Sequence, residues 1–528
     1  MAKSIKKNAA LLAALMIISA VCFLFAGRKE GMFIDEIYSF GLANSYYAPF
    51  VTDLKDGDMR DKVMTRQELT DYLAVGEDDG FAFGSVYYNQ VRDVHPPLYY
   101  WLLNIASSFV PGQFSMWTGL VLDYLIYMLC LVLLYAAVLE LLGSRHCAVA
   151  AVFLYGLSTI GLSTMLMIRM YVLLTALTVL LLWGVVLCMK GKLRKGCVIS
   201  ALALFMGLLT QYYFVFYAFF LCGFYVIYAL CRREFKGALI FAISAFAAVG
   251  LFVAVFPACF DHLFADALVS GGSAVDNLKN TAQYPERILH FVRESAHRMK
   301  GIVYVTAVLL LLCVLRFVRL RAALRRGELR LESLVVILPA FVTFLLVAVI
   351  SPVSEIRYVY NIIPVFVLAD ALMLYWLIEV DAGMLGKAAK AAAVLVIAAV
   401  ALLQARSLPP DYLYDKYSDY DALLREYAGS PCVYVNDNFY SPITYDMLQL
   451  LNFEDFLVTA DTSSPALKEY AGDAERMVVF IDISKVWASG FDAREVLDGL
   501  CESMGFESAD RLYCNGFSDV YILEDKQI

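Results

Sequence analysis

Long apolar runs alternate with short polar turns along most of the chain. Apolar runs of about 20 residues are typical of helices that cross a membrane, because backbone polar groups in hydrocarbon must be hydrogen-bonded within their own segment. The pattern predicts about eleven spanning helices, and the first is expected to be a retained anchor because no small-residue cleavage site follows it. The predicted spans are residues 8–26, 113–142, 147–166, 170–189, 197–210, 213–230, 237–258, 301–317, 333–350, 358–379 and 388–405.

Residues 97–110 are apolar but too short to cross a bilayer comfortably. If they lie in the interface, the loops that become cytoplasmic are Ser144–His146, Lys190–Lys195, Arg232–Lys236, Arg316–Arg330 and the one at Lys387. These loops are basic or nearly neutral, as the positive-inside rule requires, whereas a span at 97–110 would break the rule at four of them. We therefore predict an interfacial helix, with segments 27–112, 259–300 and 406–528 on the outer side.

A polar region begins at residues 407–410 and alternates helical and strand patterns. Strands are predicted at 432–435, 456–459, 477–483 and 519–523, and helices at 421–427 and 493–504. The predicted fold class is a polytopic α-helical membrane protein with interfacial helices in its first outer loop and a small C-terminal α/β domain. Its expected domains are residues 1–405, with outer loops 27–112 and 259–300, and residues 406–528.

Composition supports this division. The chain is 61% hydrophobic and 17% charged, with a mean hydropathy of +0.68, which excludes a soluble enzyme, a disordered protein and a nucleic-acid partner. Residues 411–528 hold 23 acidic and 8 basic residues, so the net charge of −8 combines −15 there with +7 elsewhere. Nine of the twelve cysteines lie in or beside apolar runs, so we expect no disulfide framework, with a single Cys501–Cys514 pair left open.

Two short motifs carry candidate chemistry. Asp35 and Glu36 follow the first span, and Asp93 and His95 precede Pro96-Pro97 in the same loop. An isolated acidic pair is more often a solvated helix boundary. The diproline changes that balance, because it stiffens the chain and holds Asp93 and His95 just ahead of the interfacial aromatic helix.

An acidic pair after the first helix, followed by His95-Pro96-Pro97-Leu98-Tyr99-Tyr100, resembles the GT-C membrane glycosyltransferases, in the branch of protein O-mannosyltransferases and aminoarabinose transferases. The resemblance implies a GT-C fold over residues 1–405 and transfer of a sugar from a polyprenyl-phosphate carrier. Met116-Trp117-Thr118-Gly119 stands where many relatives have an Arg-Leu pair. This departure leaves the sugar and the acceptor open.

The resemblance implies a general base for the acceptor hydroxyl, and Asp35 is the candidate. Glu36 is expected to orient the site or to pair with a cation. Asp93 and His95 are second candidates, for acceptor binding or for a divalent cation as an optional cofactor. One Asp and one His do not define a metal site, so no metal ligands are assigned.

Stabilising the departing phosphate requires cations at the outer ends of spans. Arg169 with Tyr171, and Arg357 with Tyr358, lie at such ends. Guanidinium binds phosphate bidentately, although an arginine at a span end can also reach the headgroups without further function. Basic residues in 259–300 fit catalysis or a helix that holds anionic lipid equally well.

The sequence thus predicts an inverting polyprenyl-phosphate-sugar transferase, a hexosyl- or pentosyltransferase, in the bacterial cytoplasmic membrane, with its active site and C-terminal domain outside. Its expected partners are the lipid-linked donor, membrane lipid and an acceptor that is a protein, a lipid or a wall polymer. The alternative is a non-enzymatic transporter or flippase of lipid-linked sugars, for which Asp370 near the middle of its span is the best feature. A third reading is an inactive scaffold that recruits a synthase.

Overall fold

The computed structural model describes residues 2–264, 276–351, 355–381, 387–472, 474–484 and 490–525, so part of the predicted loop 259–300 lies outside it. The chain divides into two compact units. The first comprises Met1–Gly27, Val94–Tyr99 and Leu120–Asp411, and the second comprises Arg28–Asp93, Tyr100–Gly119 and Tyr412–Ile528.

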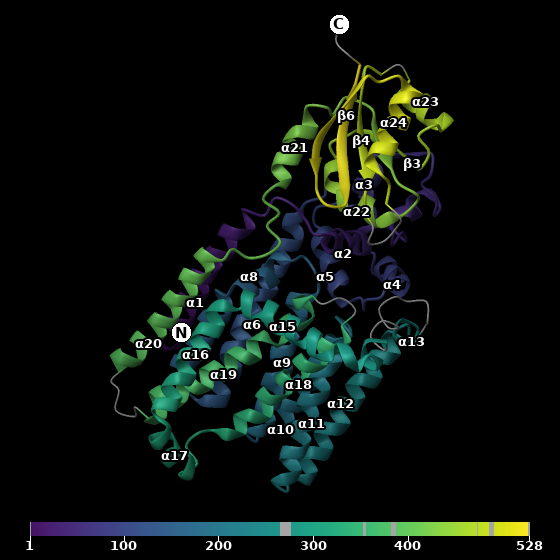
Figure 1. Ribbon diagram of the computed structural model, residues 1–528. Helices are drawn as coiled ribbons and strands as arrows, with labels where there is room; N and C mark the ends of the chain where they lie inside the picture. The colour runs from purple at the N-terminus through teal and green to yellow at the C-terminus, as the bar shows by residue number, and fades with distance from the viewer. Residues whose placement is uncertain are drawn as a thin grey trace. The chain divides into compact units, whose positions relative to one another are not determined.

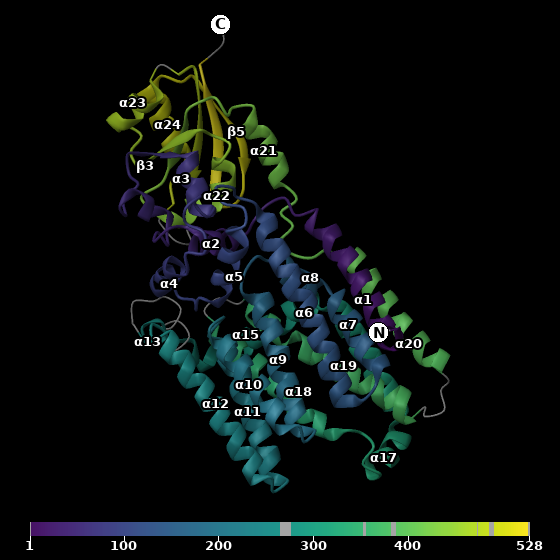
Figure 2. The same cartoon turned by 180° about the vertical axis from the view of Figure 1, so that it is seen from behind.

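The first unit is a helical bundle (Figures 1 and 2). Its long helices are α1 (Ala2–Ala26), α6 (Met116–Leu142), α7 (Arg145–Gly156), α8 (Thr159–Leu166), α9 (Tyr171–Met189), α10 (Leu193–Leu208), α11 (Phe214–Cys231), α12 (Phe235–Val255), α15 (Tyr284–Arg298), α16 (Lys300–Leu315), α18 (Leu334–Ile350), α19 (Ile363–Tyr375) and α20 (Lys387–Ser407). Shorter ones are α13 (Cys259–Phe264), α17 (Phe317–Arg325), η2 (Thr281–Gln283), η3 (Leu331–Ser333), η4 (Ile356–Ile362) and η5 (Trp376–Asp381). Helix α9 is the most enclosed of the candidate spans, and α10, α11, α18, α19 and η4 all pack against it.

Eight helical segments among the described residues are long and apolar enough to cross a membrane, and two bent pairs raise the number to ten. The bent pairs are α7 with α8, at 61°, and the segment Thr281–Arg298 with α16, at 93°. Of the eleven predicted spans, 197–210 falls short because α10 has 16 residues, and 147–166 and 301–317 qualify only through the bent pairs. The predicted fold class, a polytopic helical membrane protein with a small C-terminal α/β domain, is confirmed.

The second unit is built around a sheet (Figure 1). The segment between α1 and α6 supplies α2 (Ile34–Asn44), η1 (Val51–Lys55), β1 (Lys62–Thr65), α3 (Arg66–Leu73), α4 (Phe83–Arg92) and most of α5 (Leu98–Ser107). The C-terminal part supplies α21 (Tyr417–Arg425), β2 (Cys432–Val435), α22 (Tyr440–Leu450), β3 (Asp455–Thr459), α23 (Pro465–Ala471), β4 (Arg476–Asp482), α24 (Ala493–Met504), β5 (Ser508–Cys514) and β6 (Ser518–Glu524).

The six strands lie in the order β1-β3-β2-β4-β6-β5. The central strands β3, β2 and β4 are parallel, and the outer strands pair antiparallel. Side chains alternate across a strand, so Val433 and Val479 pack with Leu467 of α23 and Leu500 of α24 on one face. On the other face, the Tyr434 hydroxyl donates to Asp446 of α22 at 2.7 Å. The sheet is therefore covered by helices on both faces.

Strand β1 joins the outer loop to the C-terminal sheet. It pairs antiparallel with β3, with Val63 opposite Leu457 and Met64 opposite Phe456. The sequence prediction placed loop 27–112 with residues 1–405, whereas the compact units place most of that loop with residues 412–528. The physical reason is that β3 would otherwise expose an unpaired edge, and β1 satisfies its backbone groups.

The shared sheet also constrains the number of membrane crossings. Strand β1 and strands β2–β6 must lie on one side of the membrane, so the chain between them crosses an even number of times. The candidate spans after α1, each bent pair counted once, number nine. Adding α10 makes ten, whereas α5, with ten residues, is much shorter than the roughly 20 residues that a span needs. If both bent pairs and α10 cross, the number is even, in agreement with the ten spans that the sequence predicts after the first one.

The strand pairing predicts a crosslink. Val63→Cys combined with Leu457→Cys should form a disulfide under mild oxidation, because paired residues of antiparallel strands have Cα atoms about 4.5–5.5 Å apart. Mass spectrometry of the digested protein should detect the crosslinked peptide. Val63→Cys with Val435→Cys is the control, because β2 is not adjacent to β1. Equal crosslinking of both pairs would contradict the register.

Candidate functional site

The two carboxylates of the acidic pair have different surroundings. Glu36 is completely buried, and its carboxylate accepts a hydrogen bond from Lys29 Nζ at 3.0 Å. It also accepts from the backbone N–H of Phe33 at 2.6 Å, which caps the start of α2. Glu36 therefore pairs with a cation, as the sequence analysis allowed, and anchors the helix.

Lys29 was not singled out from the sequence. Its ammonium group is buried with Glu36 and donates a second hydrogen bond to the Tyr412 carbonyl at 2.6 Å. The sequence offered one general indication of this partner. A buried carboxylate needs a cation, and Arg28 and Lys29 are the basic residues nearest to Glu36 in sequence.

Asp35 is the second residue of α2 and is partly exposed. The neighbouring side chains of Ile34 and Ile37 are buried, which leaves Asp35 on the more open face of the first turn. Unpaired backbone N–H groups at a helix N-terminus favour a negative charge, so this position stabilises an ionised carboxylate. Asp35 can therefore serve as a base in its charged form.

The diproline motif connects the end of α4 to α5. The backbone N–H of Asp93 bonds to the Asn89 carbonyl at 3.0 Å and ends α4, and the Asp93 and His95 side chains are both partly exposed. After the prolines, Leu98 N–H bonds to the Leu209 carbonyl at 2.9 Å. The predicted helix at 97–110 is present as α5.

Tyr99 hydrogen-bonds to Asp123, an acidic residue within the predicted span 113–142. Its hydroxyl donates to the carboxylate of Asp123 at 3.0 Å, and both side chains are fully buried. Asp123 thus anchors the residues that follow the diproline to α6, which is a structural use of its carboxyl group.

Arg169 lies where the chain breaks between α8 and α9. The break places its N–H 2.7 Å from the Met167 carbonyl, which is a tight turn, and the side chain is only 5% exposed. Tyr171 begins α9, and its ring meets that of Tyr360 edge-on at 6.1 Å. A buried guanidinium at a helix break is held in a low-dielectric setting, where its charge acts strongly on an anion.

Arg357 lies in the 3₁₀ helix η4. Its guanidinium lies 5.8 Å from the centre of the Tyr358 ring, which in turn stacks on Tyr213 at 5.0 Å. Because η4 packs against α8 and α9, the segments that carry Arg169 and Arg357 are neighbours in the bundle. The four predicted phosphate-binding residues, Arg169, Tyr171, Arg357 and Tyr358, are thereby brought to one region of the first unit.

The predicted site residues divide between the two units. Asp35, Glu36 and Asp93 belong to the second unit, whereas His95 and the Arg-Tyr pairs belong to the first. Within the described part of the chain, no group of three or more His, Cys, Asp and Glu side chains is placed to hold a metal ion.

Comparisons with known proteins bear on the family resemblance and on the fold. Residues 94–257 match a family model described as dolichyl-phosphate-mannose-protein mannosyltransferase. The structure of ArnT from Cupriavidus metallidurans bound to undecaprenyl phosphate is similar over 98% of both chains, with a TM-score of 0.52 and 12% identity. The resemblance to the GT-C glycosyltransferases is confirmed. The apo form of the same ArnT has a TM-score of 0.49 at 12% identity over 98% of both chains.

No curated protein matches the chain in sequence. The GT-C family match begins at Val94, just before His95, and extends past Arg169. At 12% identity, the likeness to ArnT establishes the GT-C fold alone. The roles of individual residues therefore rest on the geometry described above.

The buried ion pair predicts a large loss of stability. Glu36→Gln keeps an acceptor for Phe33 N–H but removes the charged partner 3.0 Å from the buried Lys29 ammonium, which should destabilise the second unit by about 3–5 kcal/mol. Denaturant titration of the purified protein in detergent measures this change. Pairing Glu36→Gln with Lys29→Met should recover most of the loss.

Glu68→Gln is a matched control for this variant. Glu68 completes the capping box of α3 and pairs with Lys55, but that pair is partly exposed. Partly exposed pairs contribute little, so the loss should stay below about 1 kcal/mol. Equal losses for Glu36→Gln and Glu68→Gln would show that the Lys29 pair has no special weight.

Proposed function

We propose that the chain transfers a sugar from a polyprenyl-phosphate carrier to an acceptor hydroxyl at the outer face of the membrane. The observation that carries this proposal is the division of roles in the acidic pair, in which Glu36 is held by Lys29 while Asp35 remains partly exposed. The GT-C fold and the capture of undecaprenyl phosphate by ArnT support the choice of donor.

In the proposed step, Asp35 accepts the proton of the acceptor hydroxyl as its oxygen attacks the anomeric carbon. The bond between that carbon and the phosphate oxygen breaks, and the configuration inverts in a single displacement. The phosphate carries one negative charge in the donor and two in the released carrier. Arg169 and Arg357 therefore stabilise the transition state more than the bound donor, which is the requirement for catalysis.

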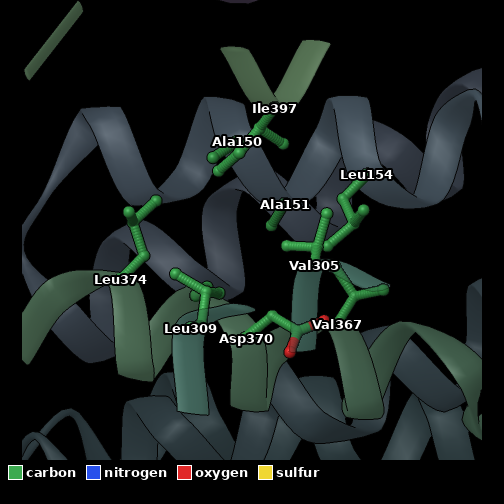
Figure 3. Close-up of a pocket in the computed structure, with 10 residues that line it drawn as sticks. Ala150, Ala151, Leu154, Val305, Leu309, Val367, Asp370, Leu374 and Ile397 are labelled. Atoms are coloured by element: carbon green, nitrogen blue, oxygen red, sulfur yellow. The ribbon is translucent and has the colours of Figure 1, made fainter. Parts of the chain in front are cut away.

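The transporter alternative rests on Asp370 of α19. Its carboxylate is 2.8 Å from the Thr306 hydroxyl and faces a cavity of about 10 Å³. Figure 3 shows the apolar side chains of α7, α16, α19 and α20 around it. A cavity of this size holds about one water molecule, so it suits local hydration better than passage of a sugar, and the enzymatic proposal is preferred.

Removal of the base should abolish turnover. Asp35→Asn should lower the rate of sugar transfer by about 10²–10⁴-fold, because the amide accepts no proton. The assay follows labelled sugar from a polyprenyl-phosphate donor into membrane acceptors, alongside retention of polyprenyl phosphate by the purified variant. Asp370→Asn is the matched control and should transfer at a rate close to that of the wild type. Unchanged turnover in Asp35→Asn would refute the assignment of the base.

The proposed phosphate contact predicts graded effects at Arg357. Arg357→Gln should lower kcat/KM for the lipid donor by about 10–100-fold, the equivalent of a charge-assisted hydrogen bond of about 1.5–3 kcal/mol. Arg357→Lys should recover only part of the loss, because lysine keeps the charge but not the bidentate fork. Arg321→Gln, on the exposed side of α17, should have no effect. Equal activity of the Gln and Lys variants would argue against phosphate recognition.

A further inference from the structure

The second unit contains a groove that the proposed reaction does not use. It has a volume of about 360 Å³, which is within the usual range for small-molecule sites. Its lining residues come from the start of α21, from α22 and from the β5–β6 turn: Tyr414, Asp415, Lys416, Tyr417, Tyr420, Tyr445, Cys514, Asn515 and Phe517. Five of these nine are aromatic, and most of the others are polar.

This lining has the two properties that a carbohydrate needs. The flat C–H faces of a sugar pack on aromatic rings, and its hydroxyls bond to hydroxyl, amide and charged groups. Asp415 and Lys416 are both exposed and balance one another in charge. Since residues 411–528 hold 23 acidic and 8 basic residues, the surrounding field disfavours an anionic ligand. A neutral sugar fits both observations.

The backbone leading into the groove is strained. Tyr412 and Tyr414 have φ values of 69° and 53°, in the left-handed region that bulky side chains rarely adopt. The segment is held by hydrogen bonds from Lys29 Nζ to the Tyr412 carbonyl and from Glu30 N–H to the Leu413 carbonyl. Strain that is secured in this way is typical of functional positions, and here it directs Tyr414 into the lining.

The start of α2 contacts one wall of the groove through Phe33. Phe33, two residues before Asp35, meets the Tyr445 ring edge-on at 6.3 Å, and Tyr445 stacks on Phe517 at 3.5 Å. A chain of aromatic contacts therefore runs from the start of α2 into the groove.

The β5–β6 turn, which forms another wall of the groove, is fixed by hydrogen bonds of Asn515. The Asn515 amide donates to the buried Asp446 carboxylate at 2.6 Å, and its oxygen accepts from the N–H groups of Phe517 and Ser518. Burial raises the pKa of Asp446 to about 6, although hydrogen bonds from Ser518, Tyr434 and Asn515 oppose the shift. The turn is thus preorganised, and Asp446 acts as a positioning residue.

We propose that this groove binds a neutral carbohydrate segment of the acceptor and presents its hydroxyl to Asp35. The acceptor role rests on the proposed transferase function, whereas the binding of neutral sugar does not. The acceptor is accordingly a glycan or glycan-bearing molecule whose terminal sugars carry no charge.

Binding can be measured on the full-length protein in detergent, without a donor. The probe is a panel of immobilised neutral oligosaccharides of glucose, galactose, mannose and N-acetylglucosamine, beside uronic acid oligomers of equal length. We expect retention on at least one neutral series and none on the acidic series. Tyr420→Ala should weaken that retention at least fivefold, and Tyr427→Ala, whose ring lies outside the groove under Arg476, should not.

A second variant covers the case in which Tyr420→Ala fails to fold. Asp415→Ala with Lys416→Ala changes only exposed side chains and should also lower retention on the neutral series. Retention of no neutral glycan, or equal retention by the groove variants and Tyr427→Ala, would overturn the inference. Asp35→Asn should bind glycans normally. If Asp35→Asn loses transfer but the protein binds no glycan, the transferase proposal is supported and the groove proposal fails. If glycan binding depends on the groove residues but Asp35→Asn transfers normally, the groove proposal is supported and the assignment of the base fails.

Discussion

The buried ion pair between Lys29 and Glu36 is the interaction on which the second unit depends. Two charges withdrawn from water are stable only when their geometry and further hydrogen bonds are good. Glu36 meets this condition by capping α2, and Lys29 meets it by binding the carbonyl of Tyr412. One pair thus joins the segment after the first span to the start of the C-terminal region, which lies 383 residues along the chain from Lys29.

The same pair explains how two adjacent acids acquire separate roles. Glu36 is paired locally with Lys29, whereas Asp35 lies partly exposed in the first turn of the helix, where a negative charge is favoured. The pair also secures the left-handed Tyr412–Tyr414 segment, whose strain would otherwise relax. Removal of Lys29 would therefore disturb the proposed base, the cap of α2 and the aromatic groove together.

Local patterns predicted most of the fold. The strand at 432–435 and the helix at 493–504 were predicted with the observed bounds, because the hydrophobic pattern within each short segment is enough to identify it. Strand β1 was missed because Lys62–Thr65 is short and gains its structure only by pairing with β3. Strand β5 was missed because Asp510 and Arg511 make an edge strand look like a loop. Among the candidate site residues, Asp35, Arg169 and Arg357 were found from sequence motifs. The pairing of Lys29 with Glu36 becomes evident only when their burial is known.

The shared sheet gives the topology a physical basis that charge counting alone lacks. The positive-inside rule favoured ten crossings between the two outer segments, and the β1–β3 ladder independently requires an even number. The two arguments use different physics, one concerning loop charge and the other backbone hydrogen bonding. Both arguments are met if the 16-residue α10 crosses, with Lys192, Arg194 and Lys195 at one end able to reach the headgroups. The short helix after the diproline is thereby left on the side of the sheet, where the carboxylate of Asp35 also lies.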